Sequence, residues 1–171
     1  AAINGDFDPQ KFGLPCIVKP ARDSGGSLGV FFAPSAEEVM IYAEYIRRMG
    51  RAPIAQEYLD DSEGEFTIGV LSLPNGEVVG SSSLRRVFDT KLSISYRGRG
   101  GLISSGYSQG YIGDFPKLCE QAVRIARALK STGPMNVQGR VKNGVLMPFE
   151  INPRLSASTY LRSLAGFNEI E

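Results

Sequence analysis

Residues 135 to 154 read MNVQGRVKNGVLMPFEINPR, two largely apolar stretches joined by a Lys-Asn-Gly turn. This pattern predicts a β-hairpin, because Asn-Gly between apolar runs is a strong hairpin signal. Glu150 and Asn152 are two residues apart and should point to one face of their strand, and the hairpin can bring Gln138 opposite them. Amide and carboxylate oxygens are ligands that hard cations prefer, so the stretch predicts a Mg²⁺ site beside Arg154.

The alternative interpretation of Gln138, Glu150 and Asn152 is the polar side of a solvated hairpin, and the pattern alone favours it. Their context favours a site instead. Glu150 and Asn152 end a strand that is otherwise largely apolar, with Val145, Leu146 and Phe149 before them. An ordinary solvent-facing strand would not need polar groups gathered at this position.

Composition limits the classes of protein that need considering. A chain of 171 residues with 42% hydrophobic content can form one ordinary domain, or two small ones sharing a cleft. The absence of histidine excludes imidazole catalysis, and Cys16 and Cys119 are expected to be free thiols. Neither a leader nor a membrane-spanning run is recognisable, so a cytoplasmic protein with no membrane partner is expected.

The net charge of +1 predicts no nucleic-acid partner, since no strong field surrounds the whole molecule. A local basic segment between Arg85 and Arg99 could form such a patch, but few aromatic residues accompany it. Binding of an anionic acceptor or of ATP phosphates is a more useful hypothesis for this segment.

Strand and helix patterns alternate along the chain. Residues 85 to 113 have no clean period and are predicted to form a functional or mobile loop. Helices are expected from a Ser35 cap to Gly50, from an Asp114 cap over residues 115 to 130, and over 157 to 165. Strands are expected over 16–20, 30–33, 54–59, 65–73 and 77–84, in addition to the hairpin.

Two further groups of residues suggest nucleotide binding, each with a simpler alternative. Lys19, at a strand end, precedes the donor-rich turn with Gly25, Gly26 and Ser27, which could wrap a polyphosphate or simply connect two strands. At the end of a second strand, exposed backbone N–H and C=O groups could form hydrogen bonds with the edge of an adenine ring. Glu65 could accept hydrogen bonds from ribose hydroxyls. The alternative for this second group, which comprises Glu57, Tyr58, Leu59 and Glu65, is a solvated acidic turn.

The order of these motifs resembles the ATP-grasp superfamily, and most closely the ATP-binding domains of the carbamoyl phosphate synthase large subunit. The resemblance covers residues 13 to 167 and depends chiefly on Glu-Ile-Asn-Pro-Arg with a glutamine twelve residues before its glutamate. The matching motifs are Lys-Pro, the Gly-Gly loop, Gln-Glu-Tyr-Leu, Gly-Glu-Phe-Thr, Asn-Val-Gln and Glu-Ile-Asn-Pro-Arg.

The resemblance implies a role for each candidate residue. Lys19 and the loop holding Gly25, Gly26 and Ser27 would bind ATP phosphates. Glu57, Tyr58 and Leu59 would form the adenine hinge, and Glu65 would hold the ribose. The trio Gln138, Glu150 and Asn152 would bind Mg²⁺ or Mn²⁺, and Arg154 would face the transferred phosphoryl group, with Lys19 and Arg154 as the catalytic residues.

The implied fold is α+β, with two subdomains of mainly antiparallel sheet and a nucleotide cleft between them. Residues 1–13 are expected as a lead-in, 14–59 as the lid subdomain and 60–171 as the metal-binding subdomain. Because the chain begins Ala-Ala and supplies no preceding Rossmann-like domain, a processed or excised part of a longer polypeptide is expected.

The implied activity is that of an ATP- and Mg²⁺-dependent ligase, which converts a small carboxylate to an acyl phosphate for attack by an amine or similar nucleophile. The synthases carry a histidine in a loop after the hinge, and this chain has none. A related ligase is therefore expected rather than carbamoyl phosphate synthesis itself. The alternative is a non-catalytic nucleotide-binding or structural module, or an inactive fragment of such a ligase.

Overall fold

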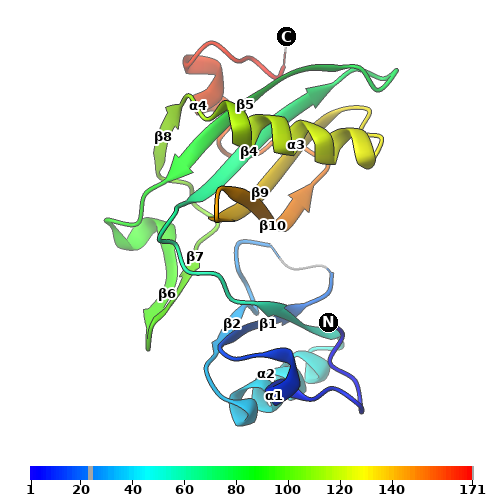
Figure 1. Cartoon of the computed structure of the whole chain (residues 1–171), viewed down its shortest axis with the longest axis vertical. Helices are drawn as coiled ribbons and strands as arrows, with labels where there is room; N and C mark the ends of the chain where they lie inside the picture. Colours follow the sequence, from blue (N-terminus) through cyan, green and yellow to red (C-terminus); the bar gives the residue numbers. More distant parts are fainter. Residues whose placement is uncertain (23–24, 171) are drawn as a thin grey trace. The chain divides into compact units, whose positions relative to one another are not determined.

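The computed structural model describes residues 1–22 and 25–170, which form two compact units (Figure 1). Unit 1 comprises Ala1–Asp60 and Asp89–Tyr107, and unit 2 comprises Asp61–Phe88 and Ser108–Glu171. This division differs from the expected boundary after residue 59, because residues 89–107 and the expected lead-in both belong to unit 1. The physical reason is packing: Ile3 is 4% exposed in the core of unit 1, and Tyr96 stacks on the buried Phe32.

Unit 1 is built on a three-stranded antiparallel sheet in the order β2-β1-β3. Its strands are β1 (Cys16–Pro20), β2 (Phe31–Ala33) and β3 (Pro53–Glu57). Helix α2 (Ala36–Arg48) begins at the predicted cap, where the Ser35 hydroxyl accepts a hydrogen bond from the Glu38 amide at 3.3 Å. A short helix, α1 (Pro9–Phe12), precedes the sheet. The core between helix and sheet contains Val18, Val39, Ala43, Ile46 and Ala55.

The prediction that residues 85–113 form an irregular loop is wrong. The segment contains the end of β5 (Val78–Arg86) and the 3-10 helix η1 (Lys91–Ser93). The hairpin of β6 (Ile94–Gly98) and β7 (Gly101–Ser104) comes next, followed by β8 (Gly110–Gly113). These strands are four or five residues long and rich in glycine and serine, so too few apolar residues remain to display a period of two.

Unit 2 contains a five-stranded antiparallel sheet in the order β10-β9-β4-β5-β8. Its long strands are β4 (Glu65–Ser72), β5 (Val78–Arg86), β9 (Pro134–Lys142) and β10 (Val145–Asn152). Helix α3 (Pro116–Ala128) covers one face, over Phe66, Ile68 and Val137 (Figure 1). The residue at the N-cap position is Phe115, without a side-chain capping hydrogen bond, rather than Asp114 as predicted, because Pro116 takes the first helical position, where a missing N–H costs nothing.

The opposite face of this sheet receives the C-terminal segment, including α4 (Thr159–Leu164). Two glycines make room for it. A Cβ atom on Gly69 would lie 2.3 Å from the Glu169 carboxylate, and one on Gly80 would lie 2.8 Å from the Phe167 ring. The sheet of unit 2 is therefore covered on both faces, with an apolar layer under α3 and a polar layer under α4.

A β-bulge in β10 decides which side chains join the polar layer. Pro148 pairs with Gly139 and Glu150 pairs with Gln138, so Phe149 is one extra residue in β10. A shift of one residue exchanges the two faces of a strand. Leu146 before the bulge belongs to the apolar core, whereas Glu150 and Asn152 after it lie on the face of Gln138.

Among the described residues, no helix combines the length and the apolar character that crossing a membrane requires. Both cysteines are free, and burial raises the pKa of the Cys16 thiol.

Candidate functional site

The three predicted metal ligands lie together on the polar face of unit 2. Gln138 and Glu150 are direct partners across β9 and β10, and Asn152 follows two residues later opposite Asn136. Direct partners in an antiparallel pair have Cβ atoms about 5 Å apart, which lets two side chains reach one ion. All three side chains are half-buried, and the Asn152 amide nitrogen is buried with no hydrogen bond to the described residues.

This donor set fits a Mg²⁺ or Mn²⁺ ion. It offers one carboxylate and two amide groups, and Mg²⁺ is commonly held by one or two carboxylates plus phosphate oxygens of a substrate. The described part of the chain contains no group of three His, Cys, Asp or Glu residues that could hold a metal. The predicted set does not require such a group, because two of its three members are amides.

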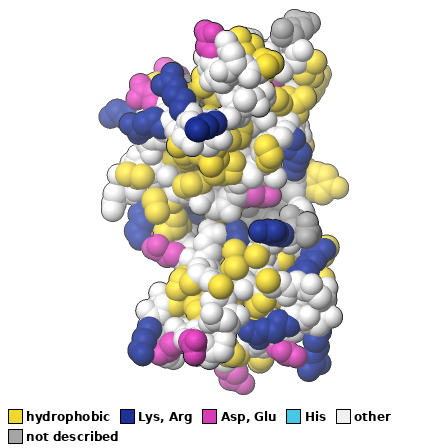
Figure 2. Space-filling view, turned by 90° about the vertical axis from the view of Figure 1, so that its right-hand side faces the viewer, with side chains coloured by type: hydrophobic (Ala, Val, Ile, Leu, Met, Phe, Trp, Pro, Cys, Tyr) yellow, Lys and Arg dark blue, Asp and Glu magenta, His cyan; other side chains and the backbone are white. Residues whose placement is uncertain are grey.

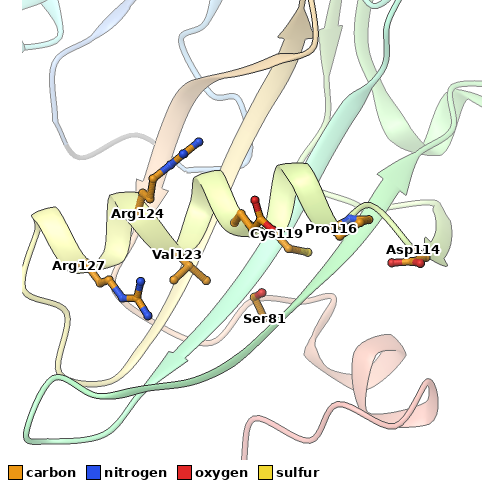
Figure 3. A pocket seen from close by; sticks show the side chains of 8 residues that line it. Ser81, Asp114, Pro116, Cys119, Val123, Arg124 and Arg127 are labelled. Atoms are coloured by element: carbon orange, nitrogen blue, oxygen red, sulfur yellow. The ribbon is translucent and has the colours of Figure 1, made fainter.

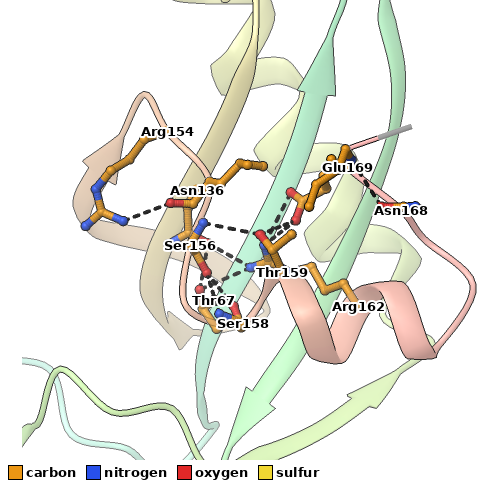
Figure 4. Close-up of polar contacts among 11 residues, drawn as sticks. Thr67, Asn136, Arg154, Ser156, Ser158, Thr159, Arg162, Asn168 and Glu169 are labelled. Atoms are coloured by element: carbon orange, nitrogen blue, oxygen red, sulfur yellow. Dashed lines mark hydrogen bonds and ion pairs between the residues drawn. The ribbon is translucent and has the colours of Figure 1, made fainter.

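Arg154 follows directly after β10. Its backbone N–H donates to the carbonyl oxygen of Asn152 at 2.8 Å, which closes a tight turn after the strand. Its exposed guanidinium donates to the carbonyl oxygen of Leu155 at 2.9 Å (Figure 4). A permanent cation is thus held two residues from the proposed metal ligand Asn152.

A buried polar network lies beside these residues and was not predicted from the sequence. Arg162 of α4 is fully buried, and it donates to Asn136 Oδ1 at 2.7 Å and to a Glu169 oxygen at 3.1 Å (Figure 4). The Thr67 hydroxyl also donates to Asn136 Oδ1, at 2.8 Å. Burial lowers the pKa of the Arg162 guanidinium, and the Glu169 carboxylate opposes this effect. The only sequence signal for this network was that Asn136 lies two residues before Gln138, and therefore on the same face of the strand.

Glu65, the predicted ribose acceptor, occupies a buried ionic cluster. It is 1% exposed, and its two oxygens accept from Arg86 at 3.2 Å and from Arg140 at 2.9 Å. Burial lowers the pKa of the Arg86 guanidinium, while Glu65 raises it. In this conformation the carboxylate of Glu65 is engaged by two guanidinium groups, which favours a structural role over contact with ribose.

The predicted phosphate-binding residues lie in unit 1. Lys19 is half-buried near the end of β1, opposite Ile54 of β3. In the loop that follows, Gly26 has φ +61° and Ser27 has φ +66°, both in the left-handed region. Left-handed backbone is uncommon for a residue with a side chain, so Ser27 holds a conformation that its surroundings must support. Asp23 and Ser24 of the predicted loop lie outside the described residues.

The predicted adenine hinge also lies in unit 1, at the end of β3. Glu57 is the last residue of the strand and is exposed, while Leu59 is half-buried. Tyr58 packs edge-on against Phe32 with ring centroids 4.8 Å apart, and its hydroxyl accepts from the Leu102 N–H at 3.0 Å. The structure therefore brings the predicted phosphate-binding residues and the predicted hinge residues into one unit, and the predicted metal ligands together in the other.

A hollow of about 600 Å³ lies elsewhere in unit 2, between α3 and β5 (Figure 3). Its lining includes Ser81, Cys119, Arg124 and Arg127. This hollow is on the α3 side of the sheet, whereas the predicted metal ligands are on the opposite face. On the face shown in Figure 2, Lys and Arg side chains lie in separate groups among acidic and hydrophobic ones rather than in one basic stripe.

Comparisons with known proteins address the fold and the relationship. No family model matches the chain. It is 27% identical over 159 residues to the carbamoyl phosphate synthase large chain of Methanosarcina acetivorans, covering 91% of this chain and 14% of that one. D-alanine–D-alanine ligase from Bacillus anthracis, complexed with ATP, superposes with a TM-score of 0.63 at 19% identity, covering 99% of this chain and 55% of the ligase. Biotin carboxylase from Campylobacter jejuni superposes with a TM-score of 0.64 at 19% identity, covering 94% of this chain and 36% of the carboxylase.

The chain therefore has the α+β fold of the ATP-grasp enzymes, as the sequence predicted. Its sequence is similar, more particularly, to the carbamoyl phosphate synthase large chain, of which it spans 14% of the length.

Proposed function

We propose that this chain is the ATP-binding portion of an ATP- and Mg²⁺-dependent ligase that activates a small carboxylate as an acyl phosphate. A carboxylate oxygen of the acceptor attacks the γ-phosphorus, the bond to the β,γ-bridging oxygen breaks, and ADP leaves. An amine or similar nucleophile then attacks the acyl carbon and displaces phosphate. The full activity would belong to the longer polypeptide, since this chain spans 14% of its relative's length.

The observation that carries the proposal is the trio Gln138, Glu150 and Asn152, placed on one face by the bulge at Phe149. A bulge that turns an acid and an amide away from the apolar core and toward a glutamine is a costly arrangement for a merely solvated hairpin. A bound Mg²⁺ would supply charge neutralisation at the β- and γ-phosphate oxygens.

The remaining roles follow from charge and position. Lys19 and Arg154 are basic residues that would contact the phosphates and the transferred phosphoryl group. The backbone of Gly25, Gly26 and Ser27 would donate N–H groups to phosphate oxygens, since left-handed turns create anion-binding concavities. Tyr58 and its neighbours Glu57 and Leu59 would contact the adenine. Glu65 would reach the ribose only by leaving Arg86 or Arg140, so we assign it no contact with ATP in the present conformation.

A second candidate function is nucleotide binding without turnover. The observation that favours it is that the Glu65 carboxylate pairs with two arginines, so the expected contact between Glu65 and the ribose is not made. The two functions predict the same nucleotide affinity but differ in phosphate release. Only the ligase would release phosphate from ATP when a suitable carboxylic acid is present.

The first prediction tests the metal assignment. Glu150→Ala should weaken binding of a Mn²⁺–ADP complex by at least about tenfold, because it removes the sole carboxylate of the trio. Isothermal titration and the electron paramagnetic resonance signal of Mn²⁺ both measure this binding. Glu77→Ala is the matched control, since Glu77 is an exposed glutamate in the turn before β5. Equal weakening in both variants, or in neither, would contradict the assignment.

A further inference from the structure

The hairpin β6–β7 and the residues after it contact both segments of unit 1 to which nucleotide contacts are proposed above. The Ser27 hydroxyl donates to the Ser104 carbonyl at 2.5 Å, joining the glycine loop to the end of β7. The Leu102 N–H donates to the Tyr58 hydroxyl at 3.0 Å, joining β7 to the hinge. One hairpin therefore touches the loop and the hinge at once.

The contact with the loop is a direct approach of two backbones. A Cβ atom added to Gly106 would lie 2.8 Å from the Cα atom of Gly26. No real Cβ atom approaches that closely, and a backbone atom cannot rotate aside as a side chain can. Glycine at position 106 thus permits residues 104–106 to lie against the left-handed turn at Gly26 and Ser27.

The hairpin has a firm attachment of its own. The buried ring of Phe32 in β2 covers Gly101, where a Cβ atom would lie 2.6 Å from the ring. At the hairpin tip, the Arg99 guanidinium donates to both carboxylate oxygens of Glu38 on α2, at 2.5 and 3.3 Å. This ion pair lowers the pKa of Glu38, chiefly through the Arg99 hydrogen bond. The attachments to α2 and β2 let the hairpin hold the loop rather than follow it.

We propose that Ser104 and Gly106 are positioning residues of the nucleotide site, and that with Gly26 and Ser27 they form a loop latch. The latch holds the glycine loop in its left-handed turn before nucleotide arrives. Because the Ser27 hydroxyl donates to Ser104, Ser27 would contact phosphate through its backbone and use its side chain for the latch. This inference rests on the proposed function, since it assigns the loop to nucleotide phosphates.

The test uses a steric wedge in the latch. Gly106→Ala places a methyl group against the Gly26 backbone without strain of its own, because Gly106 does not have a positive φ. Gly5→Ala is the matched control in the same unit, where an added Cβ meets nothing within 4 Å and φ is also ordinary. Ser27→Ala removes the hydroxyl alone. The probe is the Mg²⁺ complex of AMP-PNP, measured by isothermal titration on the 171-residue chain.

Gly106→Ala and Ser27→Ala should each raise the Kd for this probe. If the wedge lowers the population of the positioned loop to about a tenth, the apparent Kd rises about tenfold. The Kd of the double variant should exceed the higher of the two single-variant Kd values by no more than about twofold, because both changes open the same latch. Gly5→Ala should bind like the unmodified chain.

Hydrogen exchange provides a readout that a general loss of stability would not reproduce. Without nucleotide, amides of residues 25–29 should exchange faster in Gly106→Ala and Ser27→Ala than in Gly5→Ala, while amides of β1 and β3 in the same unit keep their rates.

The outcomes separate this inference from the proposed function. If the unmodified chain does not bind the probe, the proposed function is wrong, and exchange in the loop still tests the latch. If the chain binds and Gly106→Ala binds equally well, or more tightly, the latch does not position the loop for nucleotide. Additive losses in the double variant would also overturn the latch.

Discussion

At the scale of single residues, the most consequential unpredicted contact is the ion pair of Arg162 and Glu169. Their side chains are 0% and 1% exposed, and the nitrogen and oxygen atoms are 3.1 Å apart. Taking two charges out of water is expensive, so such a pair persists only when further hydrogen bonds support it. Asn136, Thr67 and Thr159 provide that support.

Removing one partner should therefore be severe. Arg162→Met leaves the Glu169 carboxylate buried without its guanidinium and should cost about 3 to 5 kcal/mol in the free energy of unfolding, measured with urea. Arg48→Met removes an exposed pair with Glu44, where the side chains are 78% and 53% exposed, and should cost less than about 1 kcal/mol. A loss of similar size in both variants would show that burial of the Arg162 pair has no energetic importance.

Single residues also show where sequence reasoning fails. Glu150 and Asn152 could be placed on one face of a strand because they are two residues apart, but only the bulge at Phe149, which the sequence did not predict, puts them on the face of Gln138. The burial of Glu65 in an ionic cluster could not be predicted from its acidic neighbours, because its partners Arg86 and Arg140 lie 21 and 75 residues away in sequence. Arg162 gave no local signal either. Ion pairs between residues far apart in the sequence leave no periodic pattern, so periodicity cannot predict them.

At the scale of elements, the helices and long strands were predictable and the short strands were not. Helix α2 has a serine cap and three buried residues in helical phase, both of which the sequence displays. Strands β6 and β7 depend instead on packing against Phe32 of a different element, so tertiary context decides their conformation.

The bulge in β10 leads to an element-scale prediction. Deleting Phe149 should give a regular ladder in which Glu150 directly follows Pro148 and still lies opposite Gln138, so binding of Mn²⁺–ADP should be retained. Deleting Ile151 instead should bring Asn152 opposite Val137, on the α3 face, and weaken binding of Mn²⁺–ADP by at least about tenfold. Paramagnetic resonance of Mn²⁺ measures the affinity, and circular dichroism compares the folded content of both variants. Equal Mn²⁺ affinity in the two deletion variants would refute the assignment of Asn152 as a metal ligand.

At the scale of the whole molecule, unit 1 is assembled from two separate stretches of chain. Phe32 is 4% exposed because Tyr96 and Gly101 of the second stretch lie against it. Residues 1–60 alone would expose this ring to water. A fully buried phenylalanine side chain is worth about 1.5 to 3 kcal/mol relative to an exposed one.

We therefore expect a polypeptide of residues 1–60 joined to 89–107 by a glycine-serine linker to be about 1.5 to 3 kcal/mol more stable than residues 1–60 with the same linker alone. Urea unfolding followed by circular dichroism measures the difference. A matched polypeptide carrying Phe32→Ala should gain little from the added stretch. Equal stability with and without residues 89–107 would show that the second stretch contributes nothing to unit 1.

The same discontinuity has a consequence for the order of events on the ribosome. Residues 61–88 supply β4 and β5 of unit 2, and they emerge before the stretch that completes unit 1. Strand β4 must then wait for β9, which is synthesised after both. Unit 1 can be completed once residue 107 has emerged, but by then residues 61–88 of unit 2 have already emerged without the rest of their sheet. We expect Phe32 to stay open to chaperones until Gly101 emerges, and the edge of β4 to stay open until β9 emerges.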